Sequence, residues 1–269
     1  MSAFKGRVAV VTGAASGIGK ALSLELAARG CRVVVADLNL KGAREVVGEL
    51  GAERAIAVRC DVSKASNVQS VVNRARRQFG SLDFMFNNAG VAIVAEARDL
   101  SLRDWNRVLD INLKGVVNGT HAAYKVMLAQ GSGHIVNVAS GFGLVPGPGL
   151  IAYVTTKFGV VGLSETLRAE AHDLGIKVTV VCPGFVNTPI LASGADSMES
   201  GRALIQAPII TSERAATITL DGVARDRAII AFPLYVRLAA WLYHRCPWLF
   251  FRFLLKGARD LRRSKQKSL

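Results

Sequence analysis

The chain has 269 residues, of which 51% are hydrophobic and 20% are charged. This composition excludes disordered, fibrous and low-complexity proteins, because the apolar surface is large enough to offset the entropy of folding. The net charge is +14, and residues 225–269 hold eleven Lys and Arg against two Asp, a net charge of +9. A basic tail on a nearly ordinary body indicates an anionic partner for the tail alone.

Cysteine and histidine spacing predicts neither disulfides nor a metal site. The four cysteines lie far apart and form no Cys-x-x-Cys pair, and the four histidines lack metal-ligand spacing. We therefore expect reduced thiols in a cytoplasmic protein, and no metal. The first strand-like run begins at Arg7, so we expect no signal peptide. The longest apolar run near the C-terminus, residues 228–236, is too short to span a bilayer.

Strand-like and helix-like segments alternate along the chain. The runs rich in Val, Ile and Phe are residues 7–12, 32–37, 54–59, 82–87, 134–140 and 176–182. The segments with helical apolar spacing include residues 18–29, 64–79 and 152–174. Strands that are apolar throughout are typical of a parallel sheet covered on both faces. We predict a doubly wound, mostly parallel α/β sheet of the Rossmann type, with helices on both faces, over residues 1–232.

Local signals mark several helix ends. Ser63 can cap the helix that follows it, and Ser101 with Asp104 forms a capping-box pattern. Gly30 stands where a helix must stop.

A glycine-rich turn follows the first strand and opens a helix, at residues 12–19 (TGAASGIG). Gly13, Gly17 and Gly19 allow the backbone to approach a pyrophosphate, whose charge is met by N–H groups at the helix N-terminus. A plain tight turn is the alternative, but the order of strand, turn and helix favours dinucleotide binding. Asp37 ends the second strand and can accept hydrogen bonds from both adenine-ribose hydroxyls, which indicates NAD over NADP.

Three further residues point to acid–base chemistry. Tyr153 and Lys157 are four apart on a predicted helix, so both project from one face. A free tyrosine has a pKa near ~10, and a nearby ammonium is expected to bring it towards the working range. Ser140, at the end of the fifth strand, can stabilise charge on a reacting oxygen. Each feature alone is more often a helix surface or a cap, but their joint occurrence favours a catalytic site.

These motifs, with Asn88-Ala89-Gly90 after Asn87, resemble the short-chain dehydrogenase/reductase family over roughly residues 5–230. The resemblance implies a catalytic set of Asn112, Ser140, Tyr153 and Lys157. It implies cofactor contacts from Gly13, Ser16, Gly17, Ile18, Gly19, Asp37, Asp61, Val62, Asn88, Ala89, Gly90, Tyr153, Lys157, Pro183, Gly184, Val186 and Thr188.

The same resemblance suggests individual roles. Asn112 would hold a water on a proton relay to Lys157, while Asn88 would support either the cofactor or the central sheet. Basic residues that favour NADP in this family are missing, since Ser16 precedes the middle glycine and Leu38 follows Asp37.

The region after Thr188 is expected to select the substrate, as a flap over residues 188–212 hinged at Gly194 and Gly201. Its apolar residues are Ile190, Leu191, Met198, Leu204, Ile205, Ile209 and Ile210, and residues 91–94 and 141–146 would form other walls. Few charges face this region, which favours a lipophilic alcohol, ketone or aldehyde. The alternative is that these residues are simply core.

Residues 233–269 form a basic extension. Pro233 and Pro247 are placed to begin helices over residues 234–246 and 248–263. One side of these helices collects Arg237, Arg245, Arg252 and Arg259, with His244, Lys256 and Arg263 nearby. The other side collects Leu234, Leu238, Leu242, Leu249, Phe250, Phe253 and Leu254. Such helices either lie in an anionic membrane interface or pack on the domain or another subunit; nucleic acid is less favoured.

Two function classes remain open from the sequence. The first is an NAD-dependent oxidoreductase that transfers a hydride between nicotinamide and a lipophilic primary or secondary alcohol, ketone or aldehyde, with Tyr153 as acid and base. The second is a noncatalytic dinucleotide-binding or scaffold protein. The complete set of Ser140, Tyr153 and Lys157 favours the first. The tail is similar to those of membrane-associated family members that act on retinoids or steroids, which favours a steroid-, retinoid- or fatty-type substrate. We also expect a homo-oligomer, cytoplasmic or peripheral on a membrane.

Overall fold

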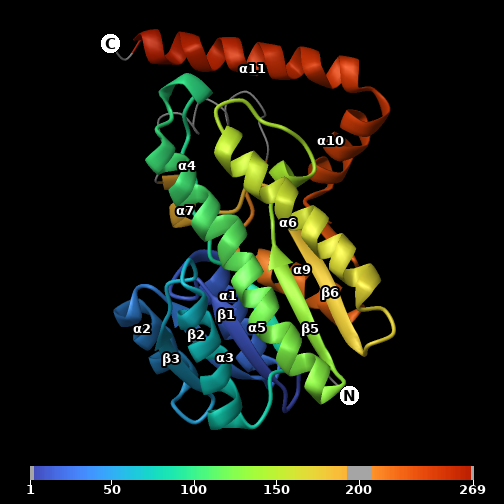
Figure 1. The fold of residues 1–269 in the computed structure, drawn as a ribbon. Helices are drawn as coiled ribbons and strands as arrows, with labels where there is room; N and C mark the ends of the chain where they lie inside the picture. Colours follow the sequence, from blue (N-terminus) through green and yellow to red (C-terminus); the bar gives the residue numbers. More distant parts are fainter. Residues whose placement is uncertain (1–2, 193–207, 268–269) are drawn as a thin grey trace.

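The computed structural model describes residues 3–192 and 208–267. Within them, seven parallel strands form one sheet of order β3-β2-β1-β4-β5-β6-β7 (Figure 1). The strands are β1 (Val8–Thr12), β2 (Arg32–Asp37), β3 (Ala55–Arg59), β4 (Phe84–Asn87), β5 (Gly133–Val138), β6 (Ile176–Pro183) and β7 (Ile229–Phe232). The order reverses between β1 and β4, which confirms the predicted doubly wound fold and places a crevice at their carboxyl ends.

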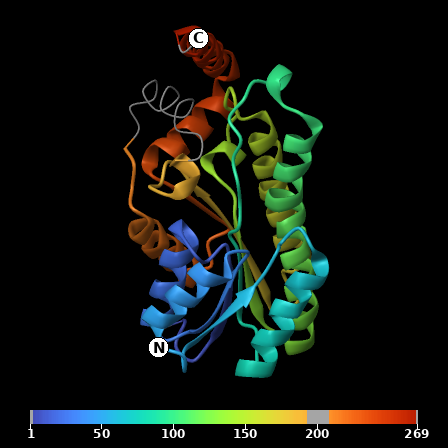
Figure 2. The same ribbon diagram turned by 90° about the vertical axis from the view of Figure 1, so that its left-hand side faces the viewer.

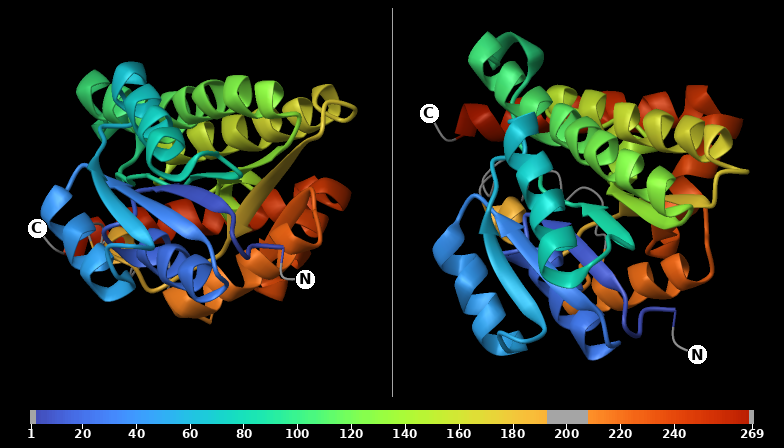
Figure 3. Two further views of the ribbon diagram at one scale, coloured as in Figure 1. Left: turned by 90° about the horizontal axis from the view of Figure 1, so that it is seen from below. Right: turned by 60° about the horizontal axis from the view of Figure 1, so that its bottom comes forward.

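Helices cover both faces of the sheet (Figures 2 and 3). On one face lie α1 (Gly17–Ala28), α2 (Leu40–Leu50) and α9 (Ser212–Ala224). On the other lie α3 (Ala65–Phe79), α4 (Leu102–Leu109), α5 (Gly115–Gln130) and α6 (Ile151–Glu170). Along β1, Ala9 and Val11 pack towards the first group, whereas Val8 and Val10 pack towards the second. Because both faces are covered, every position of β1 is buried, which is why the strand is apolar throughout.

The local signals gave one correct and one incorrect helix cap. Ser101 and Asp104 form the predicted capping box at α4. Ser63 does not cap α3, whose N-terminal cap residue is Lys64. The Ser63 hydroxyl instead donates to Asp61 Oδ1 at 2.6 Å, because it lies one residue too early to reach the free N–H groups of the helix.

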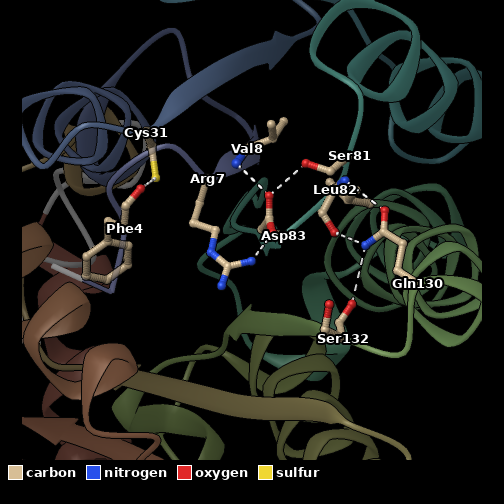
Figure 4. A network of polar contacts seen from close by, with 9 residues as sticks. All are labelled: Phe4, Arg7, Val8, Cys31, Ser81, Leu82, Asp83, Gln130 and Ser132. Atoms are coloured by element: carbon tan, nitrogen blue, oxygen red, sulfur yellow. Dashed lines mark hydrogen bonds and ion pairs between the residues drawn. The ribbon is translucent and has the colours of Figure 1, made fainter. Parts of the chain in front are cut away.

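A polar network ties the amino ends of β1 and β4 together (Figure 4). The Asp83 carboxylate accepts hydrogen bonds from Val8 N, Arg7 Nη1 and Ser81 Oγ, each at 2.8 Å. Gln130, at the end of α5, donates to Leu82 O at 2.9 Å and accepts from Leu82 N at 3.1 Å. These bonds connect the segments at the amino-terminal ends of the strands. The candidate functional residues lie at the opposite, carboxyl-terminal ends.

The tail forms two helices, α10 (Leu234–Arg245) and α11 (Pro247–Lys267), close to the predicted ranges. They meet through the rings of Tyr243 and Phe250, whose centroids are 5.3 Å apart. In Figure 1, α11 runs across the end of the molecule opposite the amino edge of the sheet. In the described parts of the chain, no helix is long and apolar enough to cross a bilayer.

Candidate active site

The glycine-rich loop joins β1 to α1 in close contact with the end of β4. Gly13 and Gly17 have φ values of +64° and +52°, which favour glycine. A Cβ on Gly13 would lie 2.8 Å from Ala89 Cα, and one on Gly19 would collide with the Gly13 carbonyl oxygen. The loop therefore exposes backbone, and the free N–H groups of the first turn of α1 make an anion site at its N-terminus.

Asp37 is held beside this loop by backbone amides. Its Oδ2 accepts from Ala15 N at 2.9 Å and its Oδ1 accepts from Asn39 N at 2.8 Å. Each carboxylate oxygen has a further lone pair for a ligand hydroxyl. Asp61, past the end of β3, accepts from Ser63 and lies on the same cavity with Val62.

Asn88 and Ala89 connect β4 to the glycine-rich loop. Asn88 Nδ2 donates to Thr12 O at 2.9 Å and Gly13 O at 3.3 Å. The Thr12 hydroxyl accepts from Asn88 N at 3.0 Å and Ala89 N at 3.1 Å. The Asn88 amide is thus engaged in holding the loop, which favours its structural role. Thr12 was given no role from the sequence, and its position at the end of an apolar strand is the one local signal for it.

Ser140, Tyr153 and Lys157 converge past the end of β5. Ser140 follows the strand and caps a short turn, Gly141–Gly143, by accepting from Phe142 N at 3.2 Å. A hydrogen bond also joins its side chain to Tyr153. Lys157 lies one turn further along α6, and its Nζ donates to Val138 O at 2.9 Å and lies 5.4 Å from the Tyr153 ring centroid.

Burial affects the protonation of this pair. It raises the pKa of Tyr153, although the hydrogen bond with Ser140 opposes the rise. It lowers the pKa of Lys157 to about 8. The sequence led us to expect a lowered Tyr153 pKa, and the structure has the opposite direction. The physical reason is that desolvation favours the neutral form of both groups, while the ammonium is directed at a backbone carbonyl.

Asn112 lies behind the cavity wall, in a π-helical turn, η2 (Asp110–Lys114), between α4 and α5. It is fully buried, accepts from Val91 N and donates to Val91 O, both at 2.8 Å. A Cβ on Gly90 would lie 3.4 Å from Asn112 Oδ1 and 3.6 Å from Lys157 Nζ, so these two side chains flank Gly90. Asn112 is thereby near Lys157, and its water-holding role stays a prediction.

The predicted residues share one cavity of about 860 Å³. Among the predicted catalytic and cofactor residues, only Gly19 and Asn112 do not line it. Gly19 packs behind the loop against Gly13 and Asn88. The residues that line it are Gly13, Ser16, Gly17, Ile18, Asp37, Asp61, Val62, Asn88, Ala89, Gly90, Ser140, Tyr153, Lys157, Pro183, Gly184, Val186 and Thr188.

The expected substrate walls are present in part. Val91 and Val94 line the cavity, as do Gly141, Phe142, Val145 and Pro146 from the segment after Ser140, and Ile190 and Leu191 from α7 (Pro189–Ala192). Ile210 forms a bridge with Val186. Ile209 and Ile210 do not line the cavity. The middle of the expected flap, residues 193–207, with Met198, Leu204, Ile205 and the hinges Gly194 and Gly201, lies outside the described residues.

The tail helices supply a wall that sequence reasoning did not place at the site. The lining residues are Tyr235, Val236 and Ala239 of α10, and Phe250, Phe253, Leu254, Lys256, Gly257 and Leu261 of α11. The proposed single apolar side of the tail was wrong, because Leu234 and Leu238 face solvent while Phe250 and Leu254 face the cavity. The helix is interrupted at Cys246, between α10 and α11. The helical spacing of α10 therefore does not continue into α11.

Specific contacts hold this wall in place. Phe185 N donates to the Tyr235 hydroxyl at 2.8 Å, which ties α10 to the loop after β6. Arg262 Nε donates to Glu96 Oε1 at 2.6 Å, and Leu261 packs on Gly149. Residues 233–267 thus pack on the body of the molecule, while their division from residues 1–232 as a separate domain stays a prediction.

Comparison with known proteins identifies the family. The family model described as short chain dehydrogenase matches residues 7–199. D-threitol dehydrogenase of Mycolicibacterium smegmatis is 42% identical over 187 residues, covering 69% of this chain and 72% of that protein. Cyclohexanol dehydrogenase of an Acinetobacter strain is 40% identical over 192 residues, covering 70% and 76%.

A solved structure supports the same assignment. A short chain dehydrogenase/reductase from Burkholderia phymatum, crystallised in complex with NAD, matches with a TM-score of 0.86 and 30% identity, covering 93% of this chain and 96% of that one. The fold, the order of the motifs and the shared cavity all agree with these similarities. The chain therefore belongs to the short chain dehydrogenase family, and it is an oxidoreductase.

Proposed function

We propose that the chain is an NAD-dependent oxidoreductase that acts on a lipophilic alcohol, ketone or aldehyde, with Tyr153 as its acid and base. The observation that carries the proposal is the cavity itself, which has the glycine-rich loop and Asp37 at one end and Tyr153 within reach of an apolar wall. The noncatalytic alternative is disfavoured, because the relatives described above are named dehydrogenases and because Ser140, Tyr153 and Lys157 line one cavity.

The residues present fit a dinucleotide. A Cβ on Gly13, Gly17 or Gly19 would crowd neighbouring atoms, so the loop presents bare backbone there, beside the free N–H groups of the first turn of α1. The Asp37 carboxylate, oriented by two backbone amides, favours NAD because it can accept from ribose hydroxyls and would repel a 2′-phosphate. The Burkholderia phymatum structure contains NAD, in agreement with this preference.

The chain's own residues handle the proton. NAD would accept the hydride in oxidation, and NADH would supply it in reduction. In oxidation, the Tyr153 phenolate takes the hydroxyl proton of the alcohol as the C–H bond breaks; in reduction, the Tyr153 phenol returns a proton to the carbonyl oxygen. Ser140 donates a hydrogen bond that stabilises negative charge on these oxygens. The Lys157 ammonium, one helical turn from Tyr153, would hold the nicotinamide ribose.

The substrate end of the cavity favours apolar molecules. Val94, Val145, Phe250, Leu254 and Leu261 line it, and Lys256 is the one cation on that wall in the described parts of the chain. Such a surface suits the ring of cyclohexanol, which a relative oxidises, better than the four hydroxyls of D-threitol, which another relative's name specifies. Because the substrate end of the cavity is lined mainly by apolar side chains, we also propose a steroid-, retinoid- or fatty-type substrate class.

Replacing Tyr153 with Phe tests the chemistry. Because Tyr153→Phe removes the proton carrier and leaves the ring in place, kcat with a lipophilic alcohol falls by at least about 100-fold. NAD affinity, measured by isothermal titration calorimetry, stays nearly unchanged. Lys157→Ala lowers both kcat and NAD affinity, because we propose that its ammonium favours the Tyr153 phenolate and holds the nicotinamide ribose. Turnover of Tyr153→Phe near the wild-type rate would contradict the mechanism.

A matched pair on α11 tests the substrate class. Leu254 lines the cavity, whereas its neighbour Leu255 is 43% exposed and does not line it. Leu254→Asp should lower kcat/KM for cyclohexanol and longer secondary alcohols by about tenfold or more, because it places a charge against an apolar substrate. Leu255→Asp should leave kcat/KM nearly unchanged. Equal effects of the two variants, or faster turnover of D-threitol than of cyclohexanol by the wild-type protein, would contradict the lipophilic class.

A cytoplasmic location and a homo-oligomeric state stay predictions. Sedimentation velocity measures the second directly.

A further inference from the structure

The tail turns a row of large apolar side chains towards solvent. Leu234, Leu238 and Trp241 recur at helical spacing on α10, and Trp248, Phe251 and Leu255 do so on α11. Trp241 is 60% exposed and Trp248 is 67% exposed. These side chains do not hold the tail to the domain, because the opposite side of α11 makes that contact through Phe250, Leu254 and Leu261.

This concentration is confined to the tail. Among the described residues, every Trp or Phe that is more than half exposed belongs to α10 or α11. Among the described residues outside the tail, only Leu38 and Leu102 are large apolar residues exposed to that degree, and they stand apart, Leu38 after β2 and Leu102 on α4. A concentration of exposed large apolar side chains of this kind marks a site of interaction.

Cations occupy the same outward surface. Arg252, Arg259 and Arg263 each follow a residue of the inner side, at positions 250, 257 and 261, by two places. Two places are about 200° of rotation around a helix, so these cations point away from the body. Within the described parts of the chain, Arg252 and Arg259 have no carboxylate partner at ion-pair distance, and residues 225–269 carry a net charge of +9.

We propose that the outward surface of α10 and α11 docks on an anionic lipid bilayer. Trp, Phe and Leu side chains interleaved with Arg and Lys suit the boundary between headgroups and acyl chains, where rings enter the apolar layer and cations meet phosphates. A second copy of the chain would bring the same positive charge against itself, and a phosphate backbone would leave the apolar row unused. Both alternatives fit the charge and the apolar row less well than a membrane.

Docking through this surface gives α11 two functions. Its inner side walls the substrate end of the cavity, and its outer side would lie on the membrane. An apolar substrate dissolved in the bilayer would then be one helix away from Tyr153. Membrane binding is inferred from the outward surface of α10 and α11 alone. It can therefore be measured without enzymatic turnover, and its test does not depend on the proposed function.

The test is co-sedimentation of the full-length protein with vesicles of phosphatidylcholine, with or without phosphatidylglycerol. We expect binding to the phosphatidylglycerol vesicles at low salt and partial release at high salt, because screening weakens the attraction. Arg252→Glu/Arg259→Glu should weaken binding by at least about tenfold, and Trp248→Glu/Phe251→Glu should abolish it. The matched controls are Arg74→Glu/Arg77→Glu on α3, far from the tail in Figure 1, and Leu102→Glu on α4; both should bind like wild type.

Three outcomes would overturn the proposal. The first is wild-type protein that ignores phosphatidylglycerol vesicles at low salt. The second is a loss of binding in the control on α3 equal to that of Arg252→Glu/Arg259→Glu. The third is Trp248→Glu/Phe251→Glu breaking an oligomer in sedimentation velocity while vesicle binding persists, which would make this surface an interface between copies. Thermal unfolding of each variant shows that it is folded.

Discussion

Tyr153 and Lys157 illustrate how burial sets the chemistry of single residues. Desolvation raises the pKa of Tyr153 and lowers that of Lys157 to about 8, so both side chains are held towards their neutral forms. The hydrogen bond with Ser140 acts in the opposite direction on Tyr153, which makes Ser140 the residue that favours the phenolate. Alcohol oxidation needs that phenolate, whereas carbonyl reduction uses the phenol that a raised pKa preserves at neutral pH.

Asp37 is the residue that we propose to select NAD over NADP. Asp37→Ala removes a charged acceptor that two backbone amides hold in position, so NAD binding should weaken by about 1–3 kcal/mol. The preference for NAD over NADP should narrow at the same time, since the carboxylate no longer repels a 2′-phosphate. Titration of both cofactors against wild type and variant measures both effects. Tighter binding of NADP than of NAD by the wild-type protein would refute the argument from Asp37.

At the scale of elements, a buried titratable side chain, His134, lies between the paired strands β5 and β6. His134 of β5 is 4% exposed, and its Nε2 lies 2.8 Å from the Thr179 hydroxyl of β6. That hydroxyl donates its one proton to Arg227 O at 2.7 Å, so it accepts from His134, which is neutral with its proton on Nε2. Burial lowers the pKa of His134 to about 4.

This group makes the fold sensitive to acid. Between about pH 6.5 and 4 the unfolded chain binds a proton at His134 that the folded chain does not, so stability is complete above this window and is lost as pH falls through it. Lowering the pH from about 7 to about 4.5 should therefore cost the wild type about 2–3 kcal/mol more than His134→Gln, in urea unfolding at each pH. His121→Gln, at an exposed position on α5, is the control and should lose as much as wild type. Identical pH dependence in His134→Gln and wild type would remove His134 from this account.

At the scale of the whole molecule, the tail completes the cavity that the doubly wound domain begins. The glycine-rich loop, Asp37 and Ser140 lie at the carboxyl ends of β1, β2 and β5. Helix α11 lies across this end of the molecule (Figures 1 and 2). The ion pair of Arg262 with Glu96 fastens α11 to the segment before α4, and the Tyr235 hydroxyl fastens α10 to the loop after β6. The two C-terminal helices thus form both the apolar wall of the cavity and an exposed apolar surface.

Local patterns in the sequence were sufficient to predict the fold and most of the residues that line the cavity. The alternation of apolar runs and helical spacing predicted the doubly wound sheet, because strands covered on both faces must be apolar at every position. The glycine-rich turn and the spacing of Tyr153 and Lys157 identified two parts of the cavity, because both depend on neighbours within one turn of backbone. These constraints are short-range, so they can be read from adjacent residues.

Contacts between distant residues decided the rest. The sequence showed that α10 and α11 are amphipathic, but which side faces the body depends on partners far along the chain, such as Glu96, which is 166 residues from Arg262. Burial of Tyr153 likewise comes from several elements at once, and so the direction of its pKa shift could not be inferred from Lys157 alone. Helical periodicity determines which residues share a side of a helix, whereas the packing of the whole chain determines what that side meets.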